Sequence, residues 1–242
     1  MVVMKVLSDI KKFLITPDDS KYSFESSGER IASFIKLFGI NLLISFVILS
    51  ALTGIIRLNL EIDFKPINIS LFNLWLANLL LIPVLEEIAF RLSLRLTKIY
   101  LSLSVSAITY MVASYSFGID IIDFNQKLLF RLAVAFIGFI TAYLLLRNKK
   151  IFENVNKVWR SNFKLIYYFF LFLFVIRHID MYELNLVTIL FLPLLLSPQL
   201  ISGIFLSFVR MRFGFGYSLI FHVMINLIAF SPQIISHVIN NS

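Results

Sequence analysis

Long apolar stretches alternate with short polar segments along almost the whole chain. Each stretch is near or above the roughly 20 residues that a helix needs to cross about 30 Å of hydrocarbon. The stretches lack the strict apolar–polar alternation of membrane β-strands, so the predicted fold class is all-α, a polytopic transmembrane helix bundle. The pattern predicts seven spans, over residues 31–56, 70–96, 99–117, 128–147, 163–179, 186–209 and 214–235.

The sixth apolar stretch contains two prolines, Pro193 and Pro198. Proline has no backbone N–H and clashes with the preceding turn, so it kinks or breaks a helix. The stretch can therefore form one kinked span or two shorter helices. Eight spans is accordingly the alternative to seven.

The apolar stretches are flanked by a polar segment at each end of the chain. We interpret residues 1–30 as a polar cytoplasmic segment, 31–235 as a single transmembrane domain and 236–242 as a short tail. Within the domain, the stretch 151–162 is amphipathic, which is typical of a loop or helix at the membrane interface.

The composition supports the membrane interpretation. Hydrophobic residues make up 59% of the chain, charged residues 15%, and the mean hydropathy is +0.89, far from the values of a soluble domain. We expect an integral, multi-pass protein of a bacterial-type cytoplasmic membrane. The chain has no cysteine, which excludes disulfides, a thiol nucleophile and a thiolate metal site. Any chemistry must use side chains such as Glu, His, Ser or Asn.

The net charge of +8 has a topological explanation. Nucleic-acid binding would require a basic patch on a water-facing fold. Instead, most of the lysines and arginines fall in alternate loops, and these loops are cytoplasmic if the N-terminus is cytoplasmic. We therefore predict a cytoplasmic N-terminus, an external C-terminus and no nucleic-acid partner.

Two carboxylates lie inside the second predicted span, at Glu86 and Glu87. A charge at the centre of a bilayer costs at least about 2.5 to 3.5 kcal/mol, so such residues face a protein interior or a wet cavity and are functional candidates. Glu87 and Arg91 are separated by four residues and can pair on one helix face. Glu86 is rotated by about 100° from Glu87, so its partner must come from another helix.

The chain has three histidines, His178, His222 and His237. His222 and Asn226 are four residues apart and project from one helix face, where they offer two hydrogen-bonding groups to a common point. His178 follows Phe174 by one turn. We expect His237, near the C-terminus, to be an exposed tail residue.

The three spans can bring their polar groups to similar depths. At about 1.5 Å per helical residue, Glu86 lies roughly 18 Å from the cytoplasmic end of its span. The same calculation gives roughly 21 Å for His178 and roughly 15 Å for His222. We therefore expect the three side chains to be able to meet.

Taken together, these residues resemble the CPBP intramembrane endopeptidases, also called the Abi family, which include CAAX prenyl protease type II (the Ras-converting enzyme) and bacteriocin-processing relatives. The family motif E-E-x-x-x-R corresponds to residues 86–91, F-x-x-x-H to 174–178 and H-x-x-x-N to 222–226. Each motif alone is weak, but their order and intramembrane setting make the set specific. The resemblance covers roughly residues 70 to 230.

The sequence departs from the family pattern in the spacing of the first two motifs. They normally lie on successive spans, whereas 92 positions and two predicted spans separate Glu86 from His178 here. Two inserted spans leave the direction of the next helix unchanged, so the site can still assemble. An alternative alignment places Tyr110 to Ser114 at the second motif, with serine in place of histidine, and implies an inactive protein. We prefer His178, because the depths agree and no ligand is lost.

The resemblance implies that Glu86 and His178 activate a water that attacks the scissile carbonyl. Desolvation makes a carboxylate a stronger base, which suits this role for Glu86. His222 and Asn226 would stabilise the oxyanion, a contribution of about a few kcal/mol per donor. The implied substrate is a membrane-embedded or lipid-anchored protein or peptide.

The resemblance gives Glu87, Arg91 and Phe174 supporting roles. No cofactor is expected, because the chain has no H-E-x-x-H helix. A divalent metal such as zinc, held by Glu86, His178 and His222, is the alternative.

Each motif also has a purely structural interpretation. The second carboxylate and Arg91 can be a bracing ion pair. His178, beside Arg177 and Asp180, can mark the outer interface. His222 and Asn226 can form a hydrogen bond between helices, which is common in membrane bundles.

Two other functions compete with proteolysis. The unusual motif spacing is compatible with a catalytically inactive relative that acts as a scaffold or bacteriocin-immunity protein. Glutamate and histidine near the midplane can also relay protons in a transporter. No internal repeat or pair of matched broken helices supports the transporter.

Overall fold

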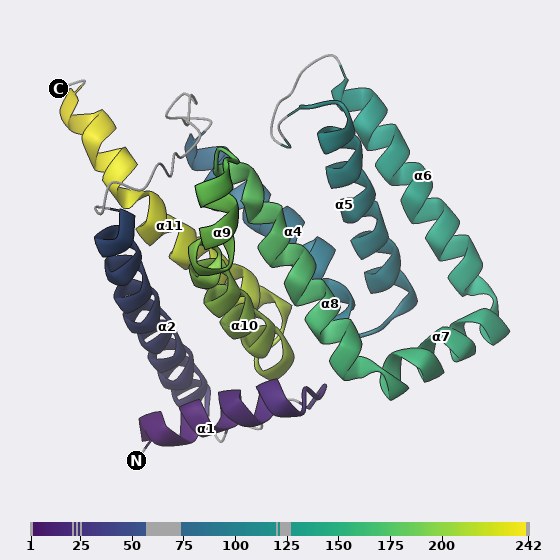
Figure 1. The fold of residues 1–242 in the computed structure, drawn as a ribbon. Coiled ribbons are helices and arrows are strands. Elements are labelled where there is room, and N and C mark those ends of the chain that lie inside the picture. Colours follow the sequence, from purple (N-terminus) through teal and green to yellow (C-terminus); the bar gives the residue numbers. More distant parts are fainter. Residues whose placement is uncertain are drawn as a thin grey trace. The chain divides into compact units, whose positions relative to one another are not determined.

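The computed structural model describes residues 2–20, 22, 24, 26–56, 74–119, 121 and 127–240. Within these ranges the chain forms helices and no β-strand, which confirms the all-α class (Figure 1). The elements are α1 (Val2–Ile15), α2 (Ser27–Ile56), the π-helix η1 (Leu74–Leu81), α4 (Ile82–Phe90), the short 3₁₀ helix η2 (Leu92–Leu94), α5 (Lys98–Ser116), α6 (Leu128–Arg147), α7 (Lys149–Ser161), α8 (Phe163–Ile176), the 3₁₀ helix η3 (Arg177–Met181), α9 (Leu186–Leu195), α10 (Ser197–Arg212) and α11 (Phe215–Asn240).

Four helical stretches in the described residues are long and apolar enough to cross a membrane. They are Ser27–Gly54, Lys98–Ser116, Leu128–Arg147 and Leu186–Arg212. A fifth is added if α7 and α8, which meet at an angle of 85°, count as one bent span. The predicted span 214–235 corresponds to the first part of α11. The predicted span 70–96 covers η1, α4 and η2, and its first four residues, 70–73, lie outside the described residues.

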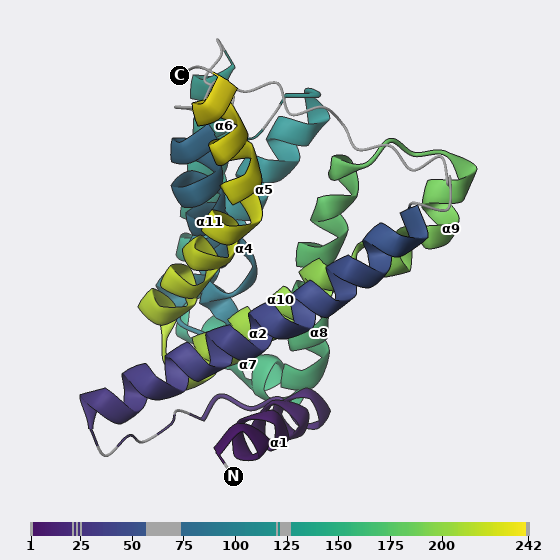
Figure 2. The ribbon, with the colours of Figure 1, turned by 90° about the vertical axis from the view of Figure 1, so that its left-hand side faces the viewer.

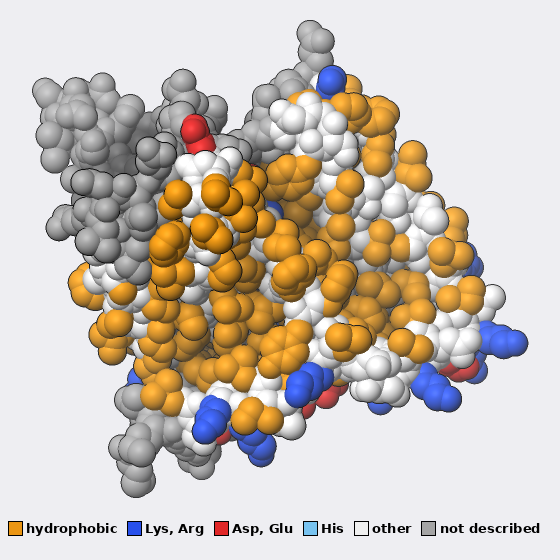
Figure 3. Space-filling view, viewed as in Figure 1, with side chains coloured by type: hydrophobic (Ala, Val, Ile, Leu, Met, Phe, Trp, Pro, Cys, Tyr) orange, Lys and Arg blue, Asp and Glu red, His pale blue; other side chains and the backbone are white. Residues whose placement is uncertain are grey.

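The apolar side chains of these helices lie largely on the outside. Leu129, Phe136 and Ile137 of α6 are each more than half exposed, and only 11% of the apolar stretch of this helix is buried. Figure 3 shows apolar side chains spread over much of the visible face. Such a surface suits contact with lipid, since soluble monomers rarely expose continuous apolar patches of this kind.

The two prolines divide the sixth apolar stretch into α9 and α10. Pro193 lies inside α9, and Pro198 occupies the first turn of α10, where its missing N–H is tolerated. The helices meet at Leu196. The two-helix alternative therefore describes the local structure, although the pair still forms one apolar stretch of 27 residues.

The region predicted as one transmembrane domain belongs to two compact units. The first unit comprises α1, α2, most of α8, η3, α9 and α10, and the second comprises η1, α4, η2, α5, α6, α7, the first turn of α8 and α11. The polar N-terminal segment therefore belongs to the first unit.

The first unit holds a helix within the segment predicted only as polar. Phe13 of α1 packs edge-to-face against Tyr167 at 5.2 Å and against Phe208 at 5.5 Å, measured between ring centroids. Arg212, at the end of α10, donates hydrogen bonds to Asp18 and to the backbone carbonyl of Ser20. Aromatic packing and an ion pair thus attach the N-terminal segment to α10.

In the second unit, α4 packs between two partners. It contacts α11, which overlies it in Figure 2, and it also contacts α5. Helix α5 in turn packs along α6 (Figure 1). The α5–α6 contact is close because small residues line it: Ser106 donates a hydrogen bond to the Ala135 carbonyl at 2.9 Å, and Gly138 faces Thr109. This packing places the middle of α4 in a protein interior.

Candidate functional site

The two adjacent carboxylates of α4 are fully enclosed. Glu86 is 1% exposed and Glu87 is not exposed at all. Burying an isolated ionised carboxylate is very costly, so each carboxylate requires compensating charges or hydrogen-bond donors. These are supplied by the next turn of α4 and by α11.

Three side chains surround the carboxylate of Glu87. Arg91, one turn later on α4, places Nη1 2.6 Å from Oε1 of Glu87, which confirms the predicted ion pair. Ser218 of α11 donates a hydrogen bond to the other oxygen, Oε2, at 2.5 Å. The third partner is His222. Glu87 therefore links α4 to α11 as well as bracing its own helix.

His222 lies between the two carboxylates. Its Nδ1 is 3.0 Å from Oε1 of Glu87, and its Nε2 is 3.3 Å from Oε2 of Glu86. The ring is 4% exposed. His222 is thus a partner of Glu86 from another helix, whereas the family resemblance gives that place to His178.

The charges of this cluster can balance. A carboxylate only accepts hydrogen bonds when ionised, so an imidazole that faces two carboxylates is best satisfied with a proton on each nitrogen. Two carboxylates are then neutralised by one imidazolium and the guanidinium of Arg91. The cluster thus joins two carboxylates, an imidazole and a guanidinium in a buried setting.

Asn226, one turn after His222, contacts η1 rather than the carboxylates. Its side-chain amide donates a hydrogen bond to the backbone carbonyl of Asn78 at 2.8 Å. In a π-helix, each backbone carbonyl accepts a hydrogen bond from the N–H five residues later. For the Asn78 carbonyl that residue is Pro83, which has no backbone N–H. The proline break therefore favours the contact between η1 and Asn226.

Ser218 and the Asn78 carbonyl were absent from the sequence-based site. A signal for Ser218 exists, because Ser218, His222 and Asn226 follow one another at intervals of four residues and form a polar stripe on one face of α11. The Asn78 carbonyl has no such signal, since a backbone group carries no sequence identity.

His178 and Phe174 lie in the first unit. Their rings are 4.9 Å apart, and Nδ1 of His178 is 2.8 Å from the Phe174 carbonyl. The carbonyl can only accept, so Nδ1 carries the proton in the neutral ring and Nε2 carries the lone pair. The structure brings Glu86, Glu87, Arg91 and His222 together in the second unit, and His178 belongs to the other one.

The alternative second motif lies within the α5–α6 hairpin. Ser114 donates a hydrogen bond to the Tyr110 carbonyl and accepts one from Nη1 of the buried Arg131 at 3.1 Å. These contacts give the segment a structural role in joining the two helices. The side chain of the remaining histidine, His237, lies outside the described residues.

The described residues contain no preformed metal-binding site. Among these residues, no three His, Asp or Glu side chains are grouped so that they could hold a metal ion. In His222, both ring nitrogens already face carboxylate oxygens. A site formed by Glu86, His178 and His222 would require residues from both units.

Comparison with known proteins identifies no relative of this chain. No family model matches the chain, and no curated protein or solved structure matches it. The chemistry of the buried cluster and the three sequence motifs are therefore the basis for a proposed function.

Proposed function

We propose that this protein is an intramembrane endopeptidase, similar to the CPBP enzymes, that hydrolyses a peptide bond of a membrane-embedded or lipid-anchored protein. The observation that carries the proposal is the position of His222 between Glu86 and Glu87 in a buried site. A carboxylate, an imidazole and a third group that orients the imidazole are the parts required for general acid–base catalysis.

In the proposed reaction, Glu86 is the general base. It takes a proton from a water molecule as the water oxygen attacks the scissile carbonyl carbon. The tetrahedral intermediate then collapses, the C–N bond breaks, and the leaving amine receives a proton from the imidazolium of His222. The proton held by Glu86 returns to His222 across their 3.3 Å contact. Proton transfer of this kind contributes about 10²- to 10⁴-fold to the rate.

Glu87, Arg91 and Ser218 are positioning residues in this scheme. Glu87 faces Nδ1 of His222 and fixes the ring so that Nε2 points toward Glu86. Arg91 and Ser218 in turn hold the two oxygens of Glu87. The imidazole is therefore oriented before substrate arrives, which reduces the reorganisation needed in the transition state.

Asn226 and His178 complete the proposal. One N–H of the Asn226 amide bonds the Asn78 carbonyl, and we assign the second N–H to the oxyanion of the tetrahedral intermediate. We assign His178 to the attacking water, together with Glu86, as the family resemblance implies. Its Nε2 lone pair is suited to accept a hydrogen bond from the water and hold it for attack, while Glu86 takes the proton.

The proposed setting is a bacterial-type cytoplasmic membrane, crossed seven times, with the N-terminus in the cytoplasm. This count takes η1 with α4 as one span and α9 with α10 as another, and eight spans result if the latter pair is counted separately. The substrate bond would be cut near the cytoplasmic half of the bilayer.

One observation favours a second candidate function, a proton-coupled transporter. Both nitrogens of a buried imidazole face carboxylates, which is the arrangement of a proton relay. A scaffold or immunity protein without catalysis is the remaining alternative. The transporter predicts proton-coupled uptake into vesicles that is lost when Glu86 is replaced, and the scaffold predicts neither cleavage nor uptake.

The decisive comparison uses purified protein in detergent and a panel of membrane-derived peptides, with products identified by mass spectrometry. We expect cleavage by the natural sequence and a loss of about 10²-fold or more in Glu86→Gln and His222→Gln. The control variant is Glu153→Gln, which neutralises an exposed carboxylate of α7. Full cleavage by both site variants would contradict the assigned residues, and the absence of cleavage by every form would favour the scaffold.

A further inference from the structure

Helix α7 is amphipathic, and its apolar face lacks a full protein partner. Ile151, Val155 and Val158 recur at helical spacing on that face. Ile151 is 38% exposed and Val158 is 60% exposed, and no residue of α7 is buried. A short helix with a partly exposed apolar face is suited to the boundary between lipid headgroups and acyl chains.

The opposite face of α7 is strongly basic. Lys149, Lys150, Lys157 and Arg160 are all exposed, and Glu153 is the one acidic residue of the helix. The Lys149–Glu153 pair is 4.0 Å apart and highly exposed, and four cations less one anion leave the helix a net charge of +3. Figure 3 shows Lys and Arg side chains at the position of α7. This charge is complementary to anionic lipid headgroups.

The connections of α7 are consistent with a position in the membrane plane. Asn148 separates it from the apolar helix α6 and caps it by accepting hydrogen bonds from the N–H groups of Lys150 and Ile151. At its other end, α7 meets α8 at an angle of 85°. If α6 crosses the bilayer, the break in the helix at Asn148 allows α7 to run along the membrane surface.

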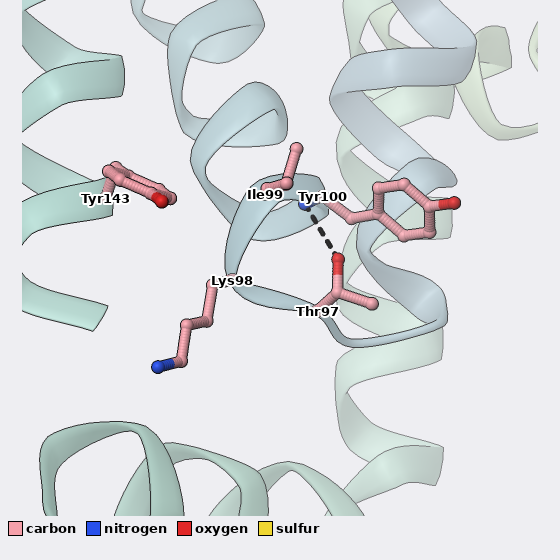
Figure 4. A pocket seen from close by; sticks show the side chains of 5 residues that line it. All are labelled: Thr97, Lys98, Ile99, Tyr100 and Tyr143. Carbon is pink, nitrogen blue, oxygen red and sulfur yellow. Dashed lines mark hydrogen bonds between the residues drawn. The ribbon is translucent and has the colours of Figure 1, made fainter. Parts of the chain in front are cut away.

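A cavity of about 390 Å³ lies near α7, at the ends of α5 and α6. Thr97, Lys98, Ile99, Tyr100 and Tyr143 line it (Figure 4). The ammonium group of Lys98 lies 5.2 Å from the ring centre of Phe152 on α7, so the cavity and the helix share a cationic edge. The Tyr100 ring points away from Lys98 and Tyr143 (Figure 4), so the cavity offers one positive charge, the Tyr143 phenol and the aliphatic side chain of Ile99, which fits a phosphate headgroup above an acyl chain.

We propose that the basic face of α7 and the cavity at Lys98 together bind anionic phospholipid of the adjoining leaflet. The headgroup phosphate contacts the cations of α7 and Lys98, while Ile151 and Val158 contact the acyl chains. Each Lys or Arg near an anionic surface adds to the attraction, so four exposed cations select anionic over neutral lipid. This lipid binding does not depend on the proposed peptidase activity.

A tryptophan of α7 provides a local probe. The chain has two tryptophans, Trp75 and Trp159, so Trp75→Phe leaves Trp159 as the single reporter. This protein is placed in two phosphatidylcholine nanodisc preparations. One contains a small fraction of brominated phosphatidylglycerol, and the other contains the same fraction of brominated phosphatidylcholine. We expect brominated phosphatidylglycerol to quench Trp159 by a factor of about two or more over brominated phosphatidylcholine, with the difference falling at high salt.

Two variants of the Trp75→Phe protein test the assignment. Replacement of Lys149, Lys150, Lys157 and Arg160 by Gln is expected to abolish the difference, with Trp159 emission in neutral discs reporting that α7 is still folded. Replacement of the exposed Lys11 and Lys12 of α1 by Gln is expected to leave it unchanged. Equal quenching by the two brominated lipids in the parent protein, or an undiminished difference in the four-site variant, would overturn the proposal.

Discussion

His222 has a carboxylate oxygen against each of its ring nitrogens and so joins Glu86 and Glu87 in one buried network. Arg91 supplies the second positive charge that two buried carboxylates require. Because removing one member of a buried ion pair leaves an uncompensated charge, each of these residues affects the folded state as well as any reaction. Variants must therefore be chosen to separate the two effects.

Replacing Arg91 tests the structural role of the cluster. In Arg91→Met, Glu87 loses its guanidinium partner, and we expect the free energy of unfolding to fall by about 3 to 5 kcal/mol. The measurement is denaturant-induced unfolding in detergent. Adding Glu87→Gln to Arg91→Met removes the unpaired charge and should recover part of the loss. Equal stability of Arg91→Met and the natural sequence would show that the ion pair does not support the fold.

The Asp18–Arg212 pair makes the attachment of α1 dependent on pH. Hydrogen bonding to the Arg212 side chain holds the pKa of Asp18 well below its usual range. A lowered folded-state pKa means that the stabilisation is present above the ordinary aspartate pKa of about 3.9 and is lost as the pH falls through the folded-state pKa. The effect is modest, because the Asp18 side chain is 45% exposed.

We expect natural protein to resist proteolysis of the N-terminal segment better than Asp18→Asn at pH 7. The difference should shrink as the pH falls below about 4, because the detached segment then binds a proton that the folded ion pair excludes, which favours detachment. Ser20→Ala is a weaker variant that keeps the ion pair and should keep the pH dependence. A difference that is constant between pH 3 and pH 7 would contradict the role of the Asp18 charge.

At the scale of elements, the contact between α5 and α6 depends on small residues. A Cβ added to Gly138 would lie 2.9 Å from Oγ1 and 3.4 Å from Cβ of Thr109, closer than ordinary contact. Small residues let membrane helices approach each other, and the hydrogen bond from Ser106 to the Ala135 carbonyl requires that approach. Because α5 packs against α4, the packing of the α5–α6 hairpin indirectly affects the position of the two carboxylates on α4.

A larger side chain at Gly138 should separate the two helices. We expect Gly138→Val to lower the free energy of unfolding by about 1 to 3 kcal/mol, the usual cost of overpacking. Gly39→Val is the matched control, because no heavy atom lies within 4 Å of the Cβ that it would introduce in α2. Thermal unfolding in detergent measures both. Similar behaviour of the two variants would argue against a close α5–α6 contact.

At the scale of the whole molecule, the sequence predicts the apolar helices well and their packing poorly. The predicted span 128–147 coincides with α6, and 99–117 differs from α5 by one residue at each end, because helix length and hydropathy are local properties. Helix α1 was not predicted. Its main apolar anchor, Phe13, packs on Tyr167 and Phe208, which are distant in the sequence.

The sequence predicts most residues of the candidate site but not the contacts between them. Helical spacing reveals the Glu87–Arg91 pair, since both partners lie on one helix. The contacts of His222 with both carboxylates depend on how far α11 is rotated toward α4, which no local pattern specifies. The contact of Asn226 with the Asn78 carbonyl depends likewise on the π-helical turn before Pro83.

In the proposed reaction, Glu86 activates a water for attack on a peptide bond, with His222 as its partner. The most direct measurement is cleavage of a membrane peptide in H₂¹⁸O, with the new carboxyl group analysed by mass spectrometry. We predict incorporation of one ¹⁸O atom by the natural sequence and a rate lower by about 10²-fold or more in Glu86→Gln. Incorporation at an undiminished rate in Glu86→Gln would contradict the claim.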